Sequence, residues 1–238
     1  MTLFSDFGDQ GLPFLLRWIH FLSGITWIGL LYYFNLVQVP FFAETEAPVR
    51  SGAQQKLLPR ALWWFRWAAM ITFLSGGLYL LEYYLHRRGV RDPGTWVILV
   101  GGILGTIMWA NVWFVIWPKN KIVIQNAIDV AAGKPANPAA AAAGARGGLA
   151  SRTNVVFSIP MLFFMGAASH LPLNRPASGP VFWALTLIVM ALVEINALTG
   201  TPGKGAAKPL ATIKGTLWFG FILTVVFYLL FVVLAPQR

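Results

Sequence analysis

The sequence predicts an all-α membrane protein, a polytopic bundle of about six transmembrane helices, on three observations. Of its 238 residues 57% are hydrophobic and only 11% are charged, against roughly a quarter in soluble domains, and the mean hydropathy is +0.65. Six apolar runs are each long enough to cross a bilayer, which takes about 20 helical residues. The runs lack the alternation of apolar and polar residues that a membrane barrel requires.

The predicted spans cover residues 13–38, 61–85, 95–117, 153–173, 179–199 and 212–235. As helices they satisfy their backbone N–H and C=O groups internally, as lipid requires. We expect one integral-membrane domain over residues 1–238. The Ala/Gly/Pro-rich segment 131–151 is predicted to be a flexible cytoplasmic linker between the third and fourth helices, and residues around 122–132 are a candidate for a short interfacial helix.

Two features inside the spans bear on helix packing. Gly101 and Gly105 in the third span form a small-xxx-small pair, which predicts close approach of another helix. Pro160 in the fourth span lacks an N–H, so it predicts a kink and a freed carbonyl that needs another partner.

The formal net charge of +10 has two interpretations. A basic soluble protein would suggest nucleic acid, but basic loops in a membrane protein follow the positive-inside rule, so we expect membrane lipid and no nucleic acid as partners. One side holds eleven basic residues: Arg50, Lys56, Arg60, Lys119, Lys121, Lys134, Arg146, Arg152, Lys204, Lys208 and Lys214. The other holds five: Arg87, Arg88, Arg91, Arg175 and Arg238. This imbalance predicts a multi-pass membrane protein with both termini outside, which in a bacterium is the periplasmic side.

The chain contains no cysteine. Its residues therefore form no disulfide, thiolate metal site, iron–sulfur cluster or covalently attached c-type haem.

Histidines inside the spans are the first candidates for function, because ionisable groups at membrane depth are costly and tend to be functional. His20 lies about two turns into the first span and His170 at the end of the fourth, and the predicted topology puts both on the outer side. Gly24 and Gly166 lie one turn deeper than these histidines, where the missing side chain would let a flat macrocycle approach. Imidazoles from two helices can ligate haem iron from opposite faces. The sequence therefore predicts haem b held by His20 and His170 near the outer surface.

Three side chains, Thr26, Trp27 and Phe163, are candidates for packing around this haem. The alternative is structural: His20 hydrogen-bonds a neighbouring helix, and His170 contacts water in the interface.

The remaining histidine, His86, ends the second span and is expected to be solvated. Glu82 lies one turn before it, so the two are expected to pair. A role of His86 as another ligand or as an entry point for protons is the less favoured interpretation.

A second polar group gathers toward the inner side: Asn35, Arg66, Asn111, Glu194 and Asn196. Arg66 and Glu194 have opposite charges at similar predicted depth, which suggests an ion pair that lowers the cost of burial. A structural, register-fixing pair is favoured over a proton or substrate path, and both interpretations stay open at this point.

Four runs resemble a known family: RWIHFLSGITWIGLLYYFN (17–35), LWWFRWAAMITFLSG (62–76), FVIWPKN (114–120) and SRTNVVFSIPMLFFMGAASH (151–170). They are similar to the membrane domain of bacterial membrane-bound urate oxidases (urate hydroxylases), and the fifth and sixth spans carry no recognised run. The resemblance implies a multi-helix inner-membrane protein linked to respiratory electron transfer. In that family a C-terminal cytochrome c domain with a C-x-x-C-H site usually follows. This chain has no cysteine, so we expect the membrane part without that domain.

Two functions remain open at this stage. The first is a urate-hydroxylase-like redox protein that passes electrons through haem b to a separate cytochrome c or a respiratory complex, with urate hydroxylation as its narrower form. The second is a non-catalytic subunit or assembly factor of a larger respiratory complex. A transporter ranks last, because only the fourth span has a helix-breaking interruption.

Overall fold

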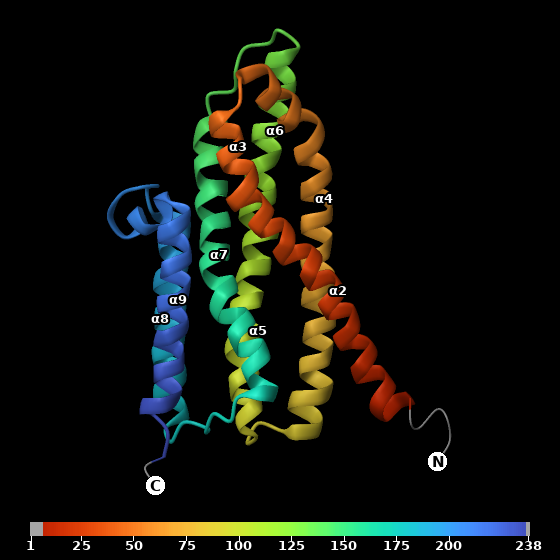
Figure 1. The fold of residues 1–238 in the computed structure, drawn as a ribbon, viewed down its shortest axis with the longest axis vertical. Helices are drawn as coiled ribbons and strands as arrows, with labels where there is room; N and C mark the ends of the chain where they lie inside the picture. The colour runs from red at the N-terminus through yellow and green to blue at the C-terminus, as the bar shows by residue number, and fades with distance from the viewer. Residues whose placement is uncertain (1–6, 237–238) are drawn as a thin grey trace.

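The computed structural model describes residues 7–236, whose regular elements are all helical (Figure 1). In chain order they are η1 (Phe7–Gly11), α2 (Leu12–Tyr32), η2 (Tyr33–Gln38), α3 (Val39–Glu44), α4 (Ala47–Tyr79), η3 (Leu80–Arg88), α5 (Pro93–Ala110), η4 (Asn111–Ile116), α6 (Trp117–Ala131), α7 (Ala140–His170), α8 (Gly179–Thr199), η5 (Gly205–Ala211) and α9 (Ile213–Val233). Elements η1 to η4 are π-helical turns that continue the α-helices beside them, and η5 is a 3₁₀ helix. The predicted all-α class is confirmed.

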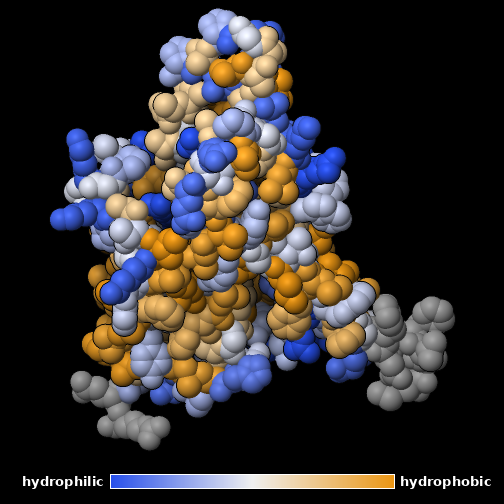
Figure 2. Space-filling model, turned by 45° about the horizontal axis from the view of Figure 1, so that its top comes forward, coloured by the Kyte–Doolittle hydropathy of each residue, from blue (hydrophilic) through white to orange (hydrophobic). Residues whose placement is uncertain are grey.

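Six continuous helices in the described residues are long and apolar enough to cross a membrane. They run over Gly8–Glu44, Ala47–Arg88, Pro93–Ala131, Ala140–His170, Gly179–Thr199 and Ile213–Val233. The number of predicted spans is therefore confirmed, and the chain has the architecture of a multi-pass membrane protein. Figure 2 shows hydrophobic side chains over the flanks of the bundle and hydrophilic ones gathered toward its ends.

The first three helices are much longer than predicted. At 1.5 Å per residue, the 42 residues of Ala47–Arg88 extend over about 63 Å, whereas the 21 residues of α8 extend over about 31 Å, close to the hydrocarbon thickness of a bilayer. In Figure 1, α3, α6 and the first turns of α4 and α7 rise beyond the level at which α8 and α9 end. We call these turns the helical head. Residues 39–60, which separate the first two predicted spans, are therefore almost entirely helical, and the apolar pattern indicated only the part of each helix that fits a membrane.

The predicted linker 131–151 is much shorter in the structure. Only residues 132–139 are non-helical, because α7 already begins at Ala140. Alanine has the highest helix propensity, and the glycines give α7 a narrow side against α6. A Cβ on Gly147 would stand 3.3 Å from Lys119 Cβ, so the small residues that suggested flexibility serve close packing.

Helix α7 is the centre of the bundle. It packs against α5, α6, α8 and α9, and 67% of its most apolar part is buried, against 44% or less in the other five helices. Its conformation therefore positions most of the other helices.

Pro160 lies inside α7, and Figure 1 shows a change of direction near the middle of that helix, as predicted. The carbonyl of Val156, four residues earlier, accepts no hydrogen bond from residue 160, because proline has no backbone N–H. A Cβ built on Gly220 of α9 would stand 3.0 Å from that oxygen. The backbone of α9 thus closes on the carbonyl that Pro160 leaves free.

The predicted small-residue contact of the third span is confirmed at Gly101. A Cβ there would stand 3.2 Å from Met161 O and 3.3 Å from Met165 N, both in the backbone of α7. At Gly105 the nearest atom, Met161 Cγ, is 3.9 Å away. Of the two glycines, Gly101 is therefore the one at which the α7 backbone lies close to α5.

We expect Gly101→Leu to destabilise the protein by about 1–3 kcal/mol, because the added side chain meets backbone that cannot rotate away. Thermal unfolding of the purified protein in detergent measures the effect. Gly105→Leu is the matched control, and an equal loss of stability in both variants would contradict this assignment.

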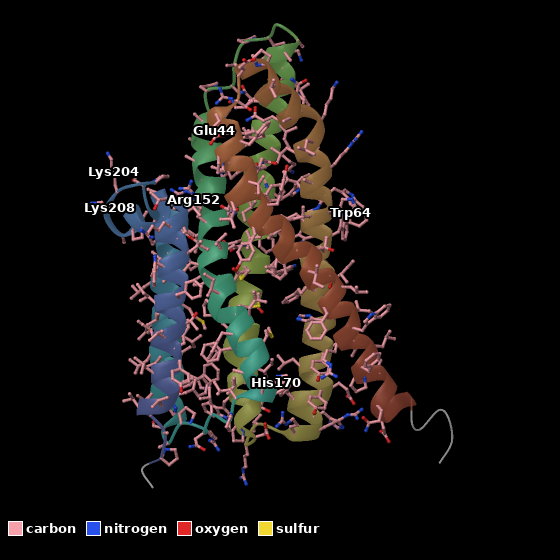
Figure 3. All side chains as sticks on the ribbon, in the orientation of Figure 1. Glu44, Trp64, Arg152, His170, Lys204 and Lys208 are labelled. Atoms are coloured by element: carbon pink, nitrogen blue, oxygen red, sulfur yellow. The ribbon has the colours of Figure 1, made fainter. Side chains whose placement is uncertain are left out.

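The two ends of the bundle differ in charge. The start of α2 and the end of α9 lie at one end, together with His170, and we call it the histidine end (Figures 1 and 3). Arg152, Lys204 and Lys208 lie toward the opposite end, beside η5, and we call that the basic end (Figure 3). Arg238, which the sequence placed with the outer group, lies outside the described residues.

Candidate functional site

His20 lies where α2 packs along α4. Its Nδ1 lies 2.9 Å from the carbonyl oxygen of Thr72. A carbonyl only accepts hydrogen bonds, so Nδ1 carries the proton and the lone pair stays on Nε2. The ring rests on Gly76, one turn further along α4, where a Cβ would stand 2.6 Å from His20 Cε1. Helix α4 therefore both orients the imidazole and makes room for it.

A strip of hydroxyl groups joins the two helices at this level. Thr72 Oγ1 donates to Ser23 Oγ over 2.9 Å, and Ser23 Oγ donates to Ile19 O over 2.8 Å. Ser75 Oγ donates to Ile71 O within α4. Such interhelical bonds fix the register of two membrane helices, so they hold His20 opposite Gly76.

Sequence reasoning did not assign a role to these α4 residues, although a signal exists. The tetrapeptide Phe-Leu-Ser-Gly occurs at residues 21–24 and again at 73–76. His20 precedes the first copy and Thr72 the second, and the structure brings the two copies together. The repeat thus marks both sides of the α2–α4 contact.

His170 is the last residue of α7, and it is exposed (Figure 3). Its Nδ1 lies 3.0 Å from the carbonyl oxygen of Gly166, so this imidazole also leaves the lone pair on Nε2. No atom lies within 4 Å of the position that a Cβ on Gly166 would take. Next to it, Ser169 Oγ lies 3.1 Å from the hydroxyl of the buried Tyr84, which holds this end of α7 against η3.

The predicted neighbours of the histidines have different surroundings. Gly24 faces α4, where a Cβ would stand 3.8 Å from Thr72 Cγ2, and Trp27 is buried. Thr26 donates to Leu22 O of its own helix. Phe163 is partly exposed and meets Tyr228 of α9, with 6.2 Å between ring centroids.

Two cavities lie elsewhere among the described residues. One, of about 10 Å³, lies between Asn35, Arg152 and Thr216, and an open groove of about 280 Å³ lies between Phe163 and Tyr228. Neither is lined by His20 or His170, so their meeting at one haem stays a prediction.

The expected pair of His86 and Glu82 is not formed. Glu82 Oε1 instead accepts from Arg87 over 2.8 Å, and His86 is exposed on η3. The π-helical turn changes the residue spacing on this face from that of an α-helix, on which the expectation was based.

The residues of the predicted inner polar group lie in three separate places in the structure. Asn111 Nδ2 donates to Glu194 Oε2 and to Asn154 Oδ1, over 3.0 Å each. Asn35 Nδ2, on η2, donates to Ser151 Oγ of α7 over 2.8 Å.

Arg66 lies apart, among tryptophans. Its guanidinium carbon stands 4.2 Å from the ring centroid of Trp117 and 5.1 Å from that of Trp113. The predicted ion pair of Arg66 and Glu194 is therefore wrong: neither residue takes part in an ion pair within residues 7–236. Similar depth does not make two helices neighbours, because α4 packs on α6 whereas α8 packs on α7 and α9.

Asn154 is a further member of this site, and no role was predicted for it. It is fully buried, and its Nδ2 donates to Met108 O over 2.9 Å, just before the π-helical turn η4. It directly follows Ser151, Arg152 and Thr153 at the polar start of the fourth predicted span, so its residue type did not distinguish it from its neighbours. Glu194, Asn111 and Asn154 therefore form one junction of α8, η4 and α7.

No three His, Asp or Glu side chains gather as a possible metal-ion site within the described part of the chain. A haem needs only one or two protein ligands, because the porphyrin supplies the other four nitrogens to the iron.

The comparison with known families gives one match. The family model described as urate oxidase N-terminal matches residues 92–228, which is more than half of the chain. No curated protein and no solved structure compared with the chain matches it. The match includes His170, Glu194, Asn111 and Asn154, and it extends over α8 and most of α9, the two helices that carry none of the four runs similar to the family. The chain belongs to the urate oxidase N-terminal family.

Proposed function

We propose that this protein is a urate-hydroxylase-like redox component of the bacterial inner membrane that binds haem b through His20 and His170. The observation that carries the proposal is the shared state of the two imidazoles. In each, Nδ1 is held by a backbone carbonyl, which is the usual outer-shell partner of a ligating histidine and leaves Nε2 free to bind iron. The chemistry of the donor set therefore fits a haem.

The residues around each imidazole have defined tasks in this proposal. The Thr72 carbonyl fixes the ring plane of His20, and Gly76 provides the space that the ring occupies. At His170 the open side of Gly166 leaves room beside the ring for a flat group. A bound haem supplies one-electron oxidation and reduction, for which a separate cytochrome c or a respiratory complex is the proposed partner. The proposed orientation places the histidine end and both termini outside.

The absorption spectrum of the purified protein, expressed with excess haem, tests the proposal. We expect a b-type Soret band with low-spin features in the wild type. His20→Ala and His170→Ala should each abolish this signal or convert it to high spin, because each removes one of the two side chains that would hold the haem. His86→Ala is the matched control and should leave the spectrum unchanged. A wild-type protein that folds but shows no Soret band would overturn the proposal.

The second candidate is a non-catalytic subunit of a larger respiratory complex. The helical head favours it, because this head stands beyond the apolar flanks and still exposes Val49 and Leu57 of α4 and Val130 of α6. In that case the protein should co-purify with a haem-containing complex even when both His20 and His170 are replaced by alanine.

A further inference from the structure

The junction of α8, η4 and α7 contains a carboxyl group whose hydrogen-bond partner is a neutral amide. Glu194 Oε2 accepts from Asn111 Nδ2 at 3.0 Å. The same Asn111 amide donates to Asn154 Oδ1, and Asn154 in turn donates to the carbonyl of Met108. Asn111 and Asn154 are 3% and 0% exposed, so they present a fixed amide to Glu194.

No cation compensates this carboxyl group within residues 7–236, in which Glu194 takes part in no ion pair. Helix α8 packs on α7, α9, α5 and η5. Of these, α5 has no ionisable side chain, as is also true of η4. The cations of the other elements lie toward the basic end and have other surroundings. Arg146 donates to Ala197 O over 2.7 Å, Arg152 donates to Leu210 O, and Lys208 and Lys214 are exposed.

An ionised carboxylate is expensive in such a place. Transfer of an unpaired charge into an apolar environment costs far more than transfer of the neutral group, and an amide donor offsets only part of that cost. Inside membranes, carboxyl groups without a counter-ion are typical of sites that take up and release protons.

We propose that Glu194 is a proton-binding site that exchanges protons with solvent at the basic end of the bundle. Its carboxylate accepts H⁺ on one oxygen to become the neutral acid, and it releases the same H⁺ to become the carboxylate again. The amide of Asn111 stays bound to the other oxygen in both states.

The position of Glu194 gives it a route to solvent. It lies five residues before Thr199, at which α8 ends, so the distance along the helix axis is about 8 Å. Glu194 is only partly buried, whereas the asparagines behind it are buried. Exchange therefore proceeds from the end near Ala197 and Arg146 and not through the core. The proposal goes beyond haem binding, and the site would operate without that cofactor.

Carbodiimide labelling of the purified wild-type protein tests the proposal. A hydrophobic carbodiimide such as dicyclohexylcarbodiimide reacts with protonated carboxyl groups in apolar surroundings and leaves a stable N-acylurea. We expect this adduct at neutral pH on the α8 peptide, located by mass spectrometry. A water-soluble carbodiimide should leave that peptide unmodified. Glu82, which is paired with Arg87 at the histidine end, is the internal control and should not react with the hydrophobic reagent.

Glu194→Gln provides the matched variant, because its amide oxygen still accepts from Asn111 but the amide neither gains nor loses a proton near neutral pH. It should fold with unchanged thermal stability and lose the adduct completely. Infrared spectra should show a carboxylic acid C=O band that shifts in D₂O and is missing in Glu194→Gln. Absence of both the adduct and the band in folded wild-type protein would overturn the proposal, as would equal labelling by the water-soluble reagent. Neither readout requires haem, so this failure is distinct from failure of the haem proposal.

Discussion

Gly76→Leu should remove His20 from its place and destabilise the protein by about 2–4 kcal/mol, the sum of overpacking and one lost interhelical hydrogen bond. A Cβ at residue 76 would stand 2.6 Å from Cε1 and 2.7 Å from Nδ1 of His20. The imidazole would have to leave α4, and its bond to Thr72 O would break. Thermal unfolding in detergent measures the loss of stability. If haem binds as proposed, the low-spin signal should disappear at the same time.

Gly77→Leu is the control for this prediction. Gly77 is the next residue of α4, and no atom lies within 4 Å of the position that its Cβ would take. The same side chain is therefore added to the same turn without meeting His20. Similar unfolding temperatures and spectra for the two variants would show that the contact of His20 with Gly76 affects neither stability nor haem binding.

The second large effect is expected for Asn154→Leu, which should lower stability by about 2–4 kcal/mol. Leucine has a similar volume but leaves Met108 O without the side-chain donor and Asn111 without one of its acceptors. The Asn111 side-chain N–H that loses its acceptor costs about 1–3 kcal/mol, and the lost hydrogen bond to Met108 O, which still accepts from Asn111 N, costs about 1 kcal/mol more. Equilibrium unfolding in mixed detergent micelles measures the difference.

Asn196→Leu controls for the general effect of replacing an amide by leucine in this region. Asn196 lies two residues after Glu194, and its side chain makes none of the hydrogen bonds of the junction. The loss of stability in Asn196→Leu should therefore be well below that in Asn154→Leu. If instead Asn154→Leu is as stable as the wild type, α7 and η4 are held together by apolar packing alone.

The helices were predictable because burial in lipid constrains composition along each span. An apolar run of about 20 residues crosses a bilayer as an α-helix, since every backbone polar group must find a partner inside the segment. The helical head does not have that constraint. Residues 47–60 and 140–150 contain no apolar run of that length, and they are helical because they pack on neighbouring helices, which the local sequence does not reveal.

The candidate site was predictable only as a set of residue types. His20, His170, Asn111 and Glu194 attract attention because polar groups are rare in these spans. Their partners Thr72, Gly76 and Asn154 could not be identified in the same way. Their role becomes visible only when the neighbouring helix is in place. The wrong ion pair between Arg66 and Glu194 has the same origin, since depth was predicted but the order of helices around the bundle was not.

The sequence by itself determined that the chain is a bundle of six apolar helices and which few polar side chains lie within them, because hydrophobic length and residue type are local properties. Only the tertiary structure decided what those side chains bind. Which carbonyl holds His20, which amide reaches Glu194 and which carbonyl Gly220 approaches all depend on how helices far apart in the sequence lie side by side. That arrangement follows from the summed packing of whole helix faces, so no single residue specifies it.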